Sequence, residues 1–532
     1  AQCDKARYTR SMRRLLEGTP GIELVEGEAV GLVESDRAVT GVVLGDGRRI
    51  LGRRVILSTG TFLSGVLHTG DHRRPGGRFG EEPSRGLSGA LESLGLRLLR
   101  LKTGTPPRLD RSSIDFGKLE VQRGDDDPRP FSWRSRAVSN RAVCWVTRTP
   151  EVVQRIIGDN LHRSPLFAGA IEGTGPRYCP SIEDKVVRFP HHTEHTVFLE
   201  PEGLDTPSIY LNGLSTSLPR DVQERIVRAI PGLEGARFLR YGYAVEYDGV
   251  PATQVERTLA VRGVEGLFLC GQILGTSGYE EAAALGFLAG VNAVLSLRGE
   301  APLVLGRGEA YLGVLVDDLV TREQREPYRM LTSRAEHRLV LGVDSARERL
   351  MARGVELGLV PERVFHVEQR RWERRRSVVK RLEGSRLNPD RSTRRLVREL
   401  AGVELNRPSS WAQLLRRTDL DRGRLAERLP ELAGLDPEDR EIVVARLRYA
   451  GYVERHRREI ARLDRLRSVP IPEELLGAAI PGLSREVREL LERFRPANLE
   501  EAESLPGMTP AAVAILAGRL GKATSAGEGG DG

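Results

Sequence analysis

Cysteine, methionine and tryptophan are scarce in this sequence, which holds four of each among 532 residues. The cysteines stand far apart, at Cys3, Cys144, Cys179 and Cys270, and no two of them form a Cys-x-x-Cys pair. This spacing argues against a disulfide framework and against a zinc knuckle, since both require paired or closely spaced thiols. Scattered cysteines favour a reducing compartment, so we expect a cytoplasmic protein.

Long apolar runs are missing as well. No stretch of 18 or more apolar residues occurs, which argues against a membrane span. The first residues, Ala1 to Lys5, resemble neither a signal peptide nor a transit peptide. A chain of 532 residues with ordinary hydrophobic content is too long for one core, so about three structural units are expected.

Lysine is scarce as well. The 82 basic side chains include only six lysines, which are Lys5, Lys102, Lys118, Lys185, Lys380 and Lys522. The net charge of +8 and the sequence pI of about 9.5 are compatible with a polyanionic partner without requiring one. Arginine binds phosphate bidentately, yet an arginine bias can equally follow from genome composition, so charge alone leaves the partner open.

Two apolar runs that end in glycine predict buried strands of an α/β domain. Residues 53–60 end in Thr59-Gly60, and residues 266–271 end in Gly271. Buried strands have this pattern where their carboxyl ends reach a ligand crevice. Residues 279–293 predict a helix with a small-residue face, whose N-terminal N–H groups point toward whatever lies at the strand ends.

The beginning of the chain predicts a helix followed by strands. Residues 4–17 have helical spacing, and residues 22–25 begin an extended stretch. Residues 39–44 and 48–51 flank Gly45-Asp46-Gly47, which is a hairpin signal.

One element of a dinucleotide-binding domain is absent from the sequence. The strand end at Thr59-Gly60 and the turn at Gly271 resemble the second and third FAD-contacting elements of glutathione-reductase-type flavoproteins. No Gly-x-Gly-x-x-Gly turn follows a strand, although that fold requires one near its start. We therefore expect an N-terminally truncated glutathione-reductase-type FAD-binding fold, with tight FAD binding in doubt.

The remaining sequence predicts a large inserted domain and an all-α C-terminal domain. Glycine, proline and turn residues dominate residues 61–240, whereas arginine-rich helical patterns cover residues 362–382 and 436–466. Two related segments place Ser484 and Thr509 as N-caps of late helices. The expected domain bounds are residues 1–60 and 241–300 for the two parts of the FAD-binding domain, 61–240 for the insertion and 301–524 for the helical region, followed by a disordered tail at 525–532.

The segment 173–185 is the most informative in the chain. It reads Gly-Thr-Gly-Pro-Arg-Tyr-Cys-Pro-Ser-Ile-Glu-Asp-Lys and fixes Cys179 between two prolines. Arg177 and Lys185 would favour the thiolate if either approaches the sulfur. A rigid loop with a thiol beside cations suits nucleophilic chemistry or binding of an anionic cofactor. The alternative is a buried structural cysteine, since most free cysteines behave as small apolar residues.

Several segments, in order along the chain, resemble the MnmG/GidA family, the large subunit of a tRNA wobble-uridine modifying enzyme. They are residues 104–108, 163–167, 173–185, 198–203, 213–218, 271–284, 311–318, 327–334 and 449–453. The resemblance implies an enzyme that binds FAD, uses NADH, and adds an aminomethyl or carboxymethylaminomethyl group at C5 of uridine 34. It implies methylene-tetrahydrofolate as carbon donor, a homodimer, and a heterotetramer with an MnmE-type GTPase. The insertion at 61–240 would then bind NADH and substrate, and the helical region at 301–524 would bind tRNA and the partner.

The resemblance also implies site residues. FAD would contact the backbone of Val30 together with Thr59, Gly60, Ser84, Gly271, Gln272, Gly278 and Glu280. The NAD segment would comprise Gly175, Pro176, Arg177, Tyr178, Cys179, Pro180, Ser181, Ile182, Glu183, Asp184, Lys185, Val186, Val187, Arg188 and Phe189. Cys179 would be catalytic, as one of two family cysteines whose counterpart would lie in an N-terminal segment that we expect to be missing. No metal is expected.

Two alternative functions stay open at this point. A folate- and FAD-dependent tRNA uridine methyltransferase of the TrmFO type shares the core fold but lacks the long helical region. A truncated chain could also be inactive while it retains partner and tRNA binding. Among single residues, Glu280 and Glu281 could be carboxylates that only stabilise the first turn of a helix. The arginines at 370–376 are expected to form a solvated helix face, and some of these arginines are expected to contact tRNA phosphates.

Overall fold

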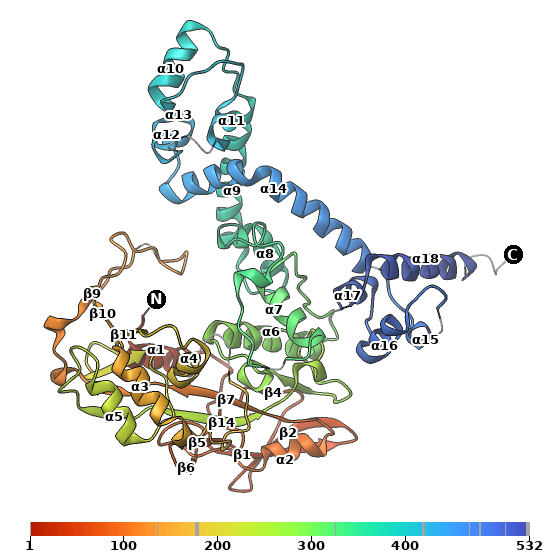
Figure 1. The fold of residues 1–532 in the computed structure, drawn as a ribbon. Coiled ribbons are helices and arrows are strands. Elements are labelled where there is room, and N and C mark those ends of the chain that lie inside the picture. Colours follow the sequence, from red (N-terminus) through yellow and green to blue (C-terminus); the bar gives the residue numbers. More distant parts are fainter. Residues whose placement is uncertain are drawn as a thin grey trace. The chain divides into compact units, whose positions relative to one another are not determined.

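The computed structural model describes residues 2–135, 137–175, 180–324, 326–417, 420, 422–467, 469–477, 480–505 and 507–527. The described chain forms two compact units (Figure 1). Unit 1 comprises Ala1–Val304 with Arg322–Met330, and unit 2 comprises Leu305–Thr321 with Leu331–Gly532. Each unit has its own hydrophobic clusters.

Unit 1 begins with helix α1 (Lys5–Glu17), which Asp4 caps by accepting a hydrogen bond from the N–H of Arg7. A three-stranded antiparallel sheet follows, formed by β1 (Ala29–Ser35), β2 (Ala38–Leu44) and β3 (Arg49–Leu51). The predicted helix and hairpin are therefore confirmed. Residues 22–25 form no strand, and their apolar side chains Ile22, Leu24 and Val25 are exposed.

The two predicted buried strands pair with each other. β4 (Val55–Leu57) and β15 (Leu267–Leu269) run parallel in the register Leu267↔Val55 and Leu269↔Leu57. After β15 come η5 (Gly271–Leu274) and α6 (Tyr279–Arg298), as the sequence predicted. Among the described helices only α6 is long and apolar enough to cross a membrane, which is weak support for a span because it packs on β4 and β15 as a core helix would.

The chain between these strands builds two further sheets. A six-stranded sheet has the order β13-β8-β12-β11-β10-β9, and a four-stranded sheet has the order β6-β5-β14-β7. The strands are β5 (Val66–Thr69), β6 (His72–Pro75), β7 (Leu99–Thr105), β8 (Arg108–Asp110), β9 (Glu120–Gln122), β10 (Cys144–Arg148), β11 (Thr196–Pro201), β12 (Ser208–Asn212), β13 (Phe238–Arg240) and β14 (Tyr243–Gly249).

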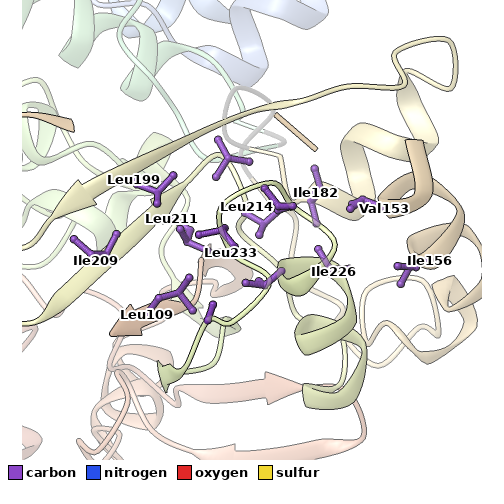
Figure 2. Close-up of a cluster of buried hydrophobic side chains, with 14 of the residues drawn as sticks. Leu109, Val153, Ile156, Ile182, Leu199, Ile209, Leu211, Leu214, Ile226 and Leu233 are labelled. Atoms are coloured by element: carbon purple, nitrogen blue, oxygen red, sulfur yellow. The ribbon is translucent and has the colours of Figure 1, made fainter. Parts of the chain in front are cut away.

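Helices cover the six-stranded sheet and close its core. They are α3 (Glu151–Asp159), α4 (Ile182–Arg188) and α5 (Arg220–Arg228), while α2 (Leu87–Ser93) packs on β1. Their apolar faces meet the sheet in the cluster of Figure 2, where Leu199 and Ile209 from the strands lie with Ile182 and Ile226 from the helices. This packing fixes α4, and with it the end of the segment that contains Cys179.

Unit 2 is helical, as predicted. Its helices are α7 (Tyr311–Thr321), α8 (Val343–Glu356), α9 (Glu362–Gly384), α10 (Arg391–Ala401), α11 (Trp411–Arg416), α12 (Arg422–Arg428), α13 (Pro430–Ala433), α14 (Pro437–Arg467), α15 (Glu473–Leu476), α16 (Arg485–Phe494), α17 (Leu499–Ser504) and α18 (Pro510–Gly527). Ser484 caps α16 and Thr509 accepts a hydrogen bond from the N–H of Ala512, so both predicted caps are confirmed.

Two predictions for unit 2 need correction. The tail was expected to be disordered from residue 525, but α18 continues to Gly527, and residues 528–532 lie outside the described range. The arginines of 370–376 were expected to be solvated, but Arg375 is only 1% exposed, and Arg371 lies 2.8 Å from Asp439 of α14. Helix α9 turns these two arginines toward the acidic first turn of α14.

Candidate functional site

The carboxyl ends of β4 and β15 meet where the sequence predicted a ligand crevice. The N–H of Cys270 donates to the carbonyl of Leu57 at 3.0 Å and extends the parallel pairing by one residue. Immediately beyond, Gly60 and Gly271 adopt φ angles of +56° and +77°, which favour glycine and turn both chains away from the sheet. The structure thus places Thr59, Gly60 and Gly271 at one sheet edge.

The N-terminus of α6 faces this region without a side-chain cap. Its N-cap is Gly278, which forms no side-chain cap hydrogen bond. Three hydroxyls near the turn are shielded from solvent and have no hydrogen-bond partner among the described residues, namely those of Thr59, Thr276 and Ser277. Buried polar groups are normally paired, so this set indicates a polar ligand. Such a group of donors at a helix N-terminus fits an anionic or polar cofactor such as FAD.

The two glutamates at the start of α6 have different surroundings. Glu281 is 5% exposed, and its Oε1 accepts hydrogen bonds from the N–H of Met330 at 2.8 Å and from Nε of Arg329 at 3.3 Å. Glu281 therefore holds the segment 322–330 against the rest of unit 1. Glu280, predicted to contact FAD, is exposed and free of that structural task.

Val30 and Ser84 also come together, although 54 positions separate them in the sequence. The Ser84 hydroxyl donates to the carbonyl of Ala29 at 2.9 Å, and a register shift between Ala29 and Gly31 takes Val30 out of regular pairing. Gly86 has φ +93°, and a Cβ there would lie 2.6 Å from the carbonyl oxygen of Val30. The N–H of Ser84 donates to Phe62, two residues after Gly60, so this pair adjoins the strand ends.

Tyr247 is a neighbour of this region that sequence reasoning missed. It is fully buried on β14, and burial raises the pKa of its phenol to about 12, while the nearby Gln272 side chain offsets part of that increase. Gln272 was predicted as an FAD contact. A tyrosine within an ordinary strand pattern carries no sequence signal of this kind.

The segment with Cys179 is described only at its two ends. Pro176, Arg177, Tyr178 and Cys179 lie outside the described residues, so the predicted catalytic residue and its neighbours are not placed. Before this gap, the N–H groups of Glu172 and Gly173 both donate to Oε1 of Glu246, at 2.9 and 2.8 Å. Gly175 lies so close to Lys102 that a Cβ there would be 3.1 Å from the lysine Cδ.

After the gap, the NAD segment becomes helix α4. Ser181 and Asp184 form a capping box, which fixes the point at which the helix begins. Glu183 is fully buried and its Oε1 accepts hydrogen bonds from the Thr216 hydroxyl at 2.9 Å and from the N–H of Ser217 at 3.0 Å. The other predicted NAD residues divide by burial: Pro180 and Lys185 are half-buried, Ile182 and Val186 are buried, and Val187, Arg188 and Phe189 are exposed.

Glu246 is the centre of a buried charged network that the sequence did not reveal. Its Oε2 lies 3.3 Å from Nε2 of His68 and 3.5 Å from Nη2 of Arg100. Burial alone would raise the pKa of Glu246, but the hydrogen bonds from His68 and the Gly173 N–H, together with the charge of Arg100, lower that pKa to about 2. An ionised carboxylate therefore anchors the backbone at the start of the Cys179 segment.

Strand β14 connects the two groups of predicted site residues. Glu246 holds Gly173, while four residues later the N–H of Val250 donates to the carbonyl of Ile273 at 2.7 Å, in the turn before α6. Four residues of extended chain span about 13 Å, the scale of a dinucleotide rather than of a small substrate. The Gly173 end of the NAD segment and the α6 turn are thus joined by one rigid strand.

The described cysteines are poor candidates for a nucleophile. Burial raises the pKa of Cys270 to about 11, and burial together with the charge of Glu200 raises the pKa of Cys144. Cys3 is exposed near the start of α1. Since the thiolate is the reactive species, neither Cys144 nor Cys270 is activated at neutral pH.

Comparisons with known proteins agree over nearly the whole chain. A family model described as "Glucose inhibited division protein A" matches residues 1–301. Models described as the MnmG/GidA C-terminal helical domain and the MnmG/GidA C-terminal helical bundle match residues 362–457 and 459–529. These ranges cover nearly all of the α/β unit and the helices of unit 2 from α9 onward.

Curated relatives carry the name "tRNA uridine 5-carboxymethylaminomethyl modification enzyme MnmG". One from Geobacter sulfurreducens is 47% identical over 97% of this chain and 82% of its own length, and one from Thermodesulfovibrio yellowstonii is 44% identical over 99% and 84%. The solved structure of GidA from Aquifex aeolicus superposes with a TM-score of 0.86 at 39% identity, covering 98% of this chain and 83% of that one. With a mixed α/β unit, a helical C-terminal region and relatives at this identity, the chain belongs to the MnmG/GidA family of tRNA-modifying enzymes.

Proposed function

We propose that this protein modifies C5 of the wobble uridine of tRNA and adds an aminomethyl or carboxymethylaminomethyl group, as the names of its relatives indicate. The observation that carries the proposal is the group of unpartnered hydroxyls at the ends of β4 and β15, below the uncapped start of α6. That arrangement fits a large polar cofactor in a tRNA-modifying family. The helical matches at 362–457 and 459–529 disfavour the methyltransferase alternative.

FAD is the cofactor that these residues fit. Val30 and Ser84 would contact it on one side, and Thr59, Gly60, Gly271, Gln272, Gly278 and Glu280 would hold it at the strand ends and at the start of α6. FAD supplies reversible electron transfer when bound. The α6 N-terminus would stabilise negative charge near it by its helix dipole.

NADH would supply electrons from the segment Gly175–Phe189. Support comes from Glu246, which holds Glu172 and Gly173 just before this segment, from the Ser181–Asp184 capping box within it, and from the link to the α6 turn through β14. Residues held in this way can present a planar nicotinamide with less entropy loss than ordering a free loop would require.

Cys179 would act on the uridine or shape the NADH site. Uracil C5 is a poor nucleophile until a group adds to C6, and a thiolate can make that addition and later leave. The carbon would come from methylene-tetrahydrofolate. We further propose that the protein is a cytoplasmic homodimer that joins an MnmE-type GTPase in a heterotetramer, in keeping with the family resemblance.

The visible absorption spectrum of the purified 532-residue chain tests the proposal, before and after FAD is added. A stoichiometric flavin band that NADH bleaches without oxygen is the expected result, followed by transfer of a carbon unit to tRNA when the GTPase and methylene-tetrahydrofolate are supplied. A folded protein without flavin that still binds tRNA and the GTPase would instead identify an inactive, partner-binding chain. Thr276→Val is the variant to compare with the unmodified chain in this titration, because it removes one unpartnered hydroxyl with little change in side-chain volume.

A further inference from the structure

One group of arginines in unit 2 is used internally. Arg371 of α9 lies 2.9 Å from Asp436 and 2.8 Å from Asp439, and Arg347 of α8 lies 2.9 Å from Glu368. Carboxylates already compensate these charges, and their side chains join α8, α9 and α14. They are poorly suited to bind a polyanion.

Helix α10 presents the second group. Its Val397 is fully buried in the surrounding helical core, and this contact fixes which face of α10 turns outward. Arg391, Arg394 and Arg395 are exposed at positions i, i+3 and i+4, so they lie within one turn of each other. Arg386, five residues before the helix, is exposed as well. We call these four arginines the α10 patch.

No carboxylate within the described parts of the chain lies at ion-pair distance from any arginine of the α10 patch. Two of the three acids near the patch in the sequence are engaged, and the third, Glu399, is exposed and offers one negative charge against four arginines. Asp390 caps α10 by accepting hydrogen bonds from the N–H and the hydroxyl of Thr393, both at 2.9 Å, and Glu404 pairs with Arg398. The α10 patch therefore has uncompensated positive charge.

The composition of this surface favours RNA over a protein partner. Protein interfaces have a core of aromatic and apolar side chains, whereas nucleic-acid interfaces are polar and strongly positive. Among the described residues from 368 to 451, only Leu396 is a large apolar side chain that is exposed. Guanidinium groups bind phosphate oxygens bidentately, which suits arginines one helical turn apart.

We infer that the α10 patch binds the phosphate backbone of tRNA, an inference that rests on the proposed function. The test is fluorescence anisotropy of labelled tRNA with the full chain, over a series of salt concentrations. The triple variant R391Q/R394Q/R395Q should bind at least about tenfold more weakly at low salt, with a log–log salt slope reduced by about two. The variant R391K/R394K/R395K should retain most of the affinity, because it keeps the charge.

The control is R10Q/R13Q/R14Q, which removes three exposed arginines of α1 and changes the net charge equally. Equal weakening by this control would overturn the inference in favour of overall charge. Unchanged tRNA binding by the α10 variant would also overturn it, and a simultaneous loss of polyglutamate binding would identify a surface for an acidic protein. If the unmodified chain binds no tRNA, the proposed function fails and this inference fails with it.

Discussion

At the scale of single residues, the buried carboxylate of Glu246 is the group with the largest consequence for the site. It accepts two backbone N–H groups at the start of the Cys179 segment and contacts His68 and Arg100. The sequence gives no sign of this role, because the four partners come from positions 68, 100, 172 and 173 and meet only in the folded sheet. A single glutamate within a strand pattern ordinarily indicates a residue on the polar, solvent-exposed face of the sheet.

Glu246 should make stability depend on acid. Its folded-state pKa of about 2 lies below the ordinary value of 4.5, so the stabilisation is complete above about pH 5 and is lost as the pH falls toward 2. The difference corresponds to an upper limit of about 3 kcal/mol. Urea unfolding of Glu246→Gln at pH 7 and pH 3 should show a destabilised variant whose pH dependence is weaker than that of the unmodified protein. Equal pH dependence of the two proteins would contradict this role.

The thiols should differ strongly in reactivity. Cys3 is exposed, whereas Cys270 is buried with a pKa of about 11, so the thiolate of Cys270 is rare at pH 8. Iodoacetamide labelling of the folded protein, followed by peptide mass spectrometry, should modify Cys3 well before Cys270 and leave Cys270 unmodified until the protein unfolds. Early labelling of Cys270 would show that the β15 end opens in solution.

At the scale of elements, strands and helices were predictable where a local pattern specified them. The apolar runs ending at Gly60 and Gly271, the helix α6 and the caps at Ser484 and Thr509 all appear as expected. The order of the two larger sheets was not predictable, since it depends on pairing between distant short strands. The solvated face predicted for α9 holds for Arg370, Arg374 and Arg376, which are exposed. It was wrong for Arg371 and Arg375, because these two meet acids of α14 that are 64 or more positions away in the sequence.

The junction between β1 and α2 should depend on a glycine. Gly86→Ala would force a left-handed backbone and place a Cβ against the Val30 carbonyl, whereas Gly80→Ala has a similar φ of +81° with nothing within 4 Å. The left-handed conformation alone costs about 1–2 kcal/mol, which both variants share. Steric overlap should lower the free energy of unfolding of Gly86→Ala by about 1–3 kcal/mol more than that of Gly80→Ala, and Gly86→Ala should bind FAD more weakly. Thermal unfolding and a flavin titration of both variants measure the difference, and equal effects would refute it.

At the scale of the whole molecule, each unit has its own buried core, so unfolding should not follow a single transition. Calorimetry should resolve two unfolding transitions. Added FAD should raise the midpoint temperature of only the transition that belongs to unit 1, since a ligand stabilises the structure that binds it. Single-transition unfolding that FAD shifts as a whole would show that the units unfold together. The return of residues 322–330 to unit 1 had no sequence signal, because they lie within the helical region predicted at 301–524.

This interleaving has a consequence for proteolysis. The polypeptide passes between the units at residues 304/305, 321/322 and 330/331, so a single cleavage cannot release either unit as a separate chain. After a cut at one crossing, the short piece 322–330 would still be gripped by Glu281 and by the bridge from Thr276 to Tyr328. A nicked molecule should therefore migrate as an intact particle under native conditions and separate into fragments only in denaturant. Three crossings of the chain, rather than one linker, connect the two units.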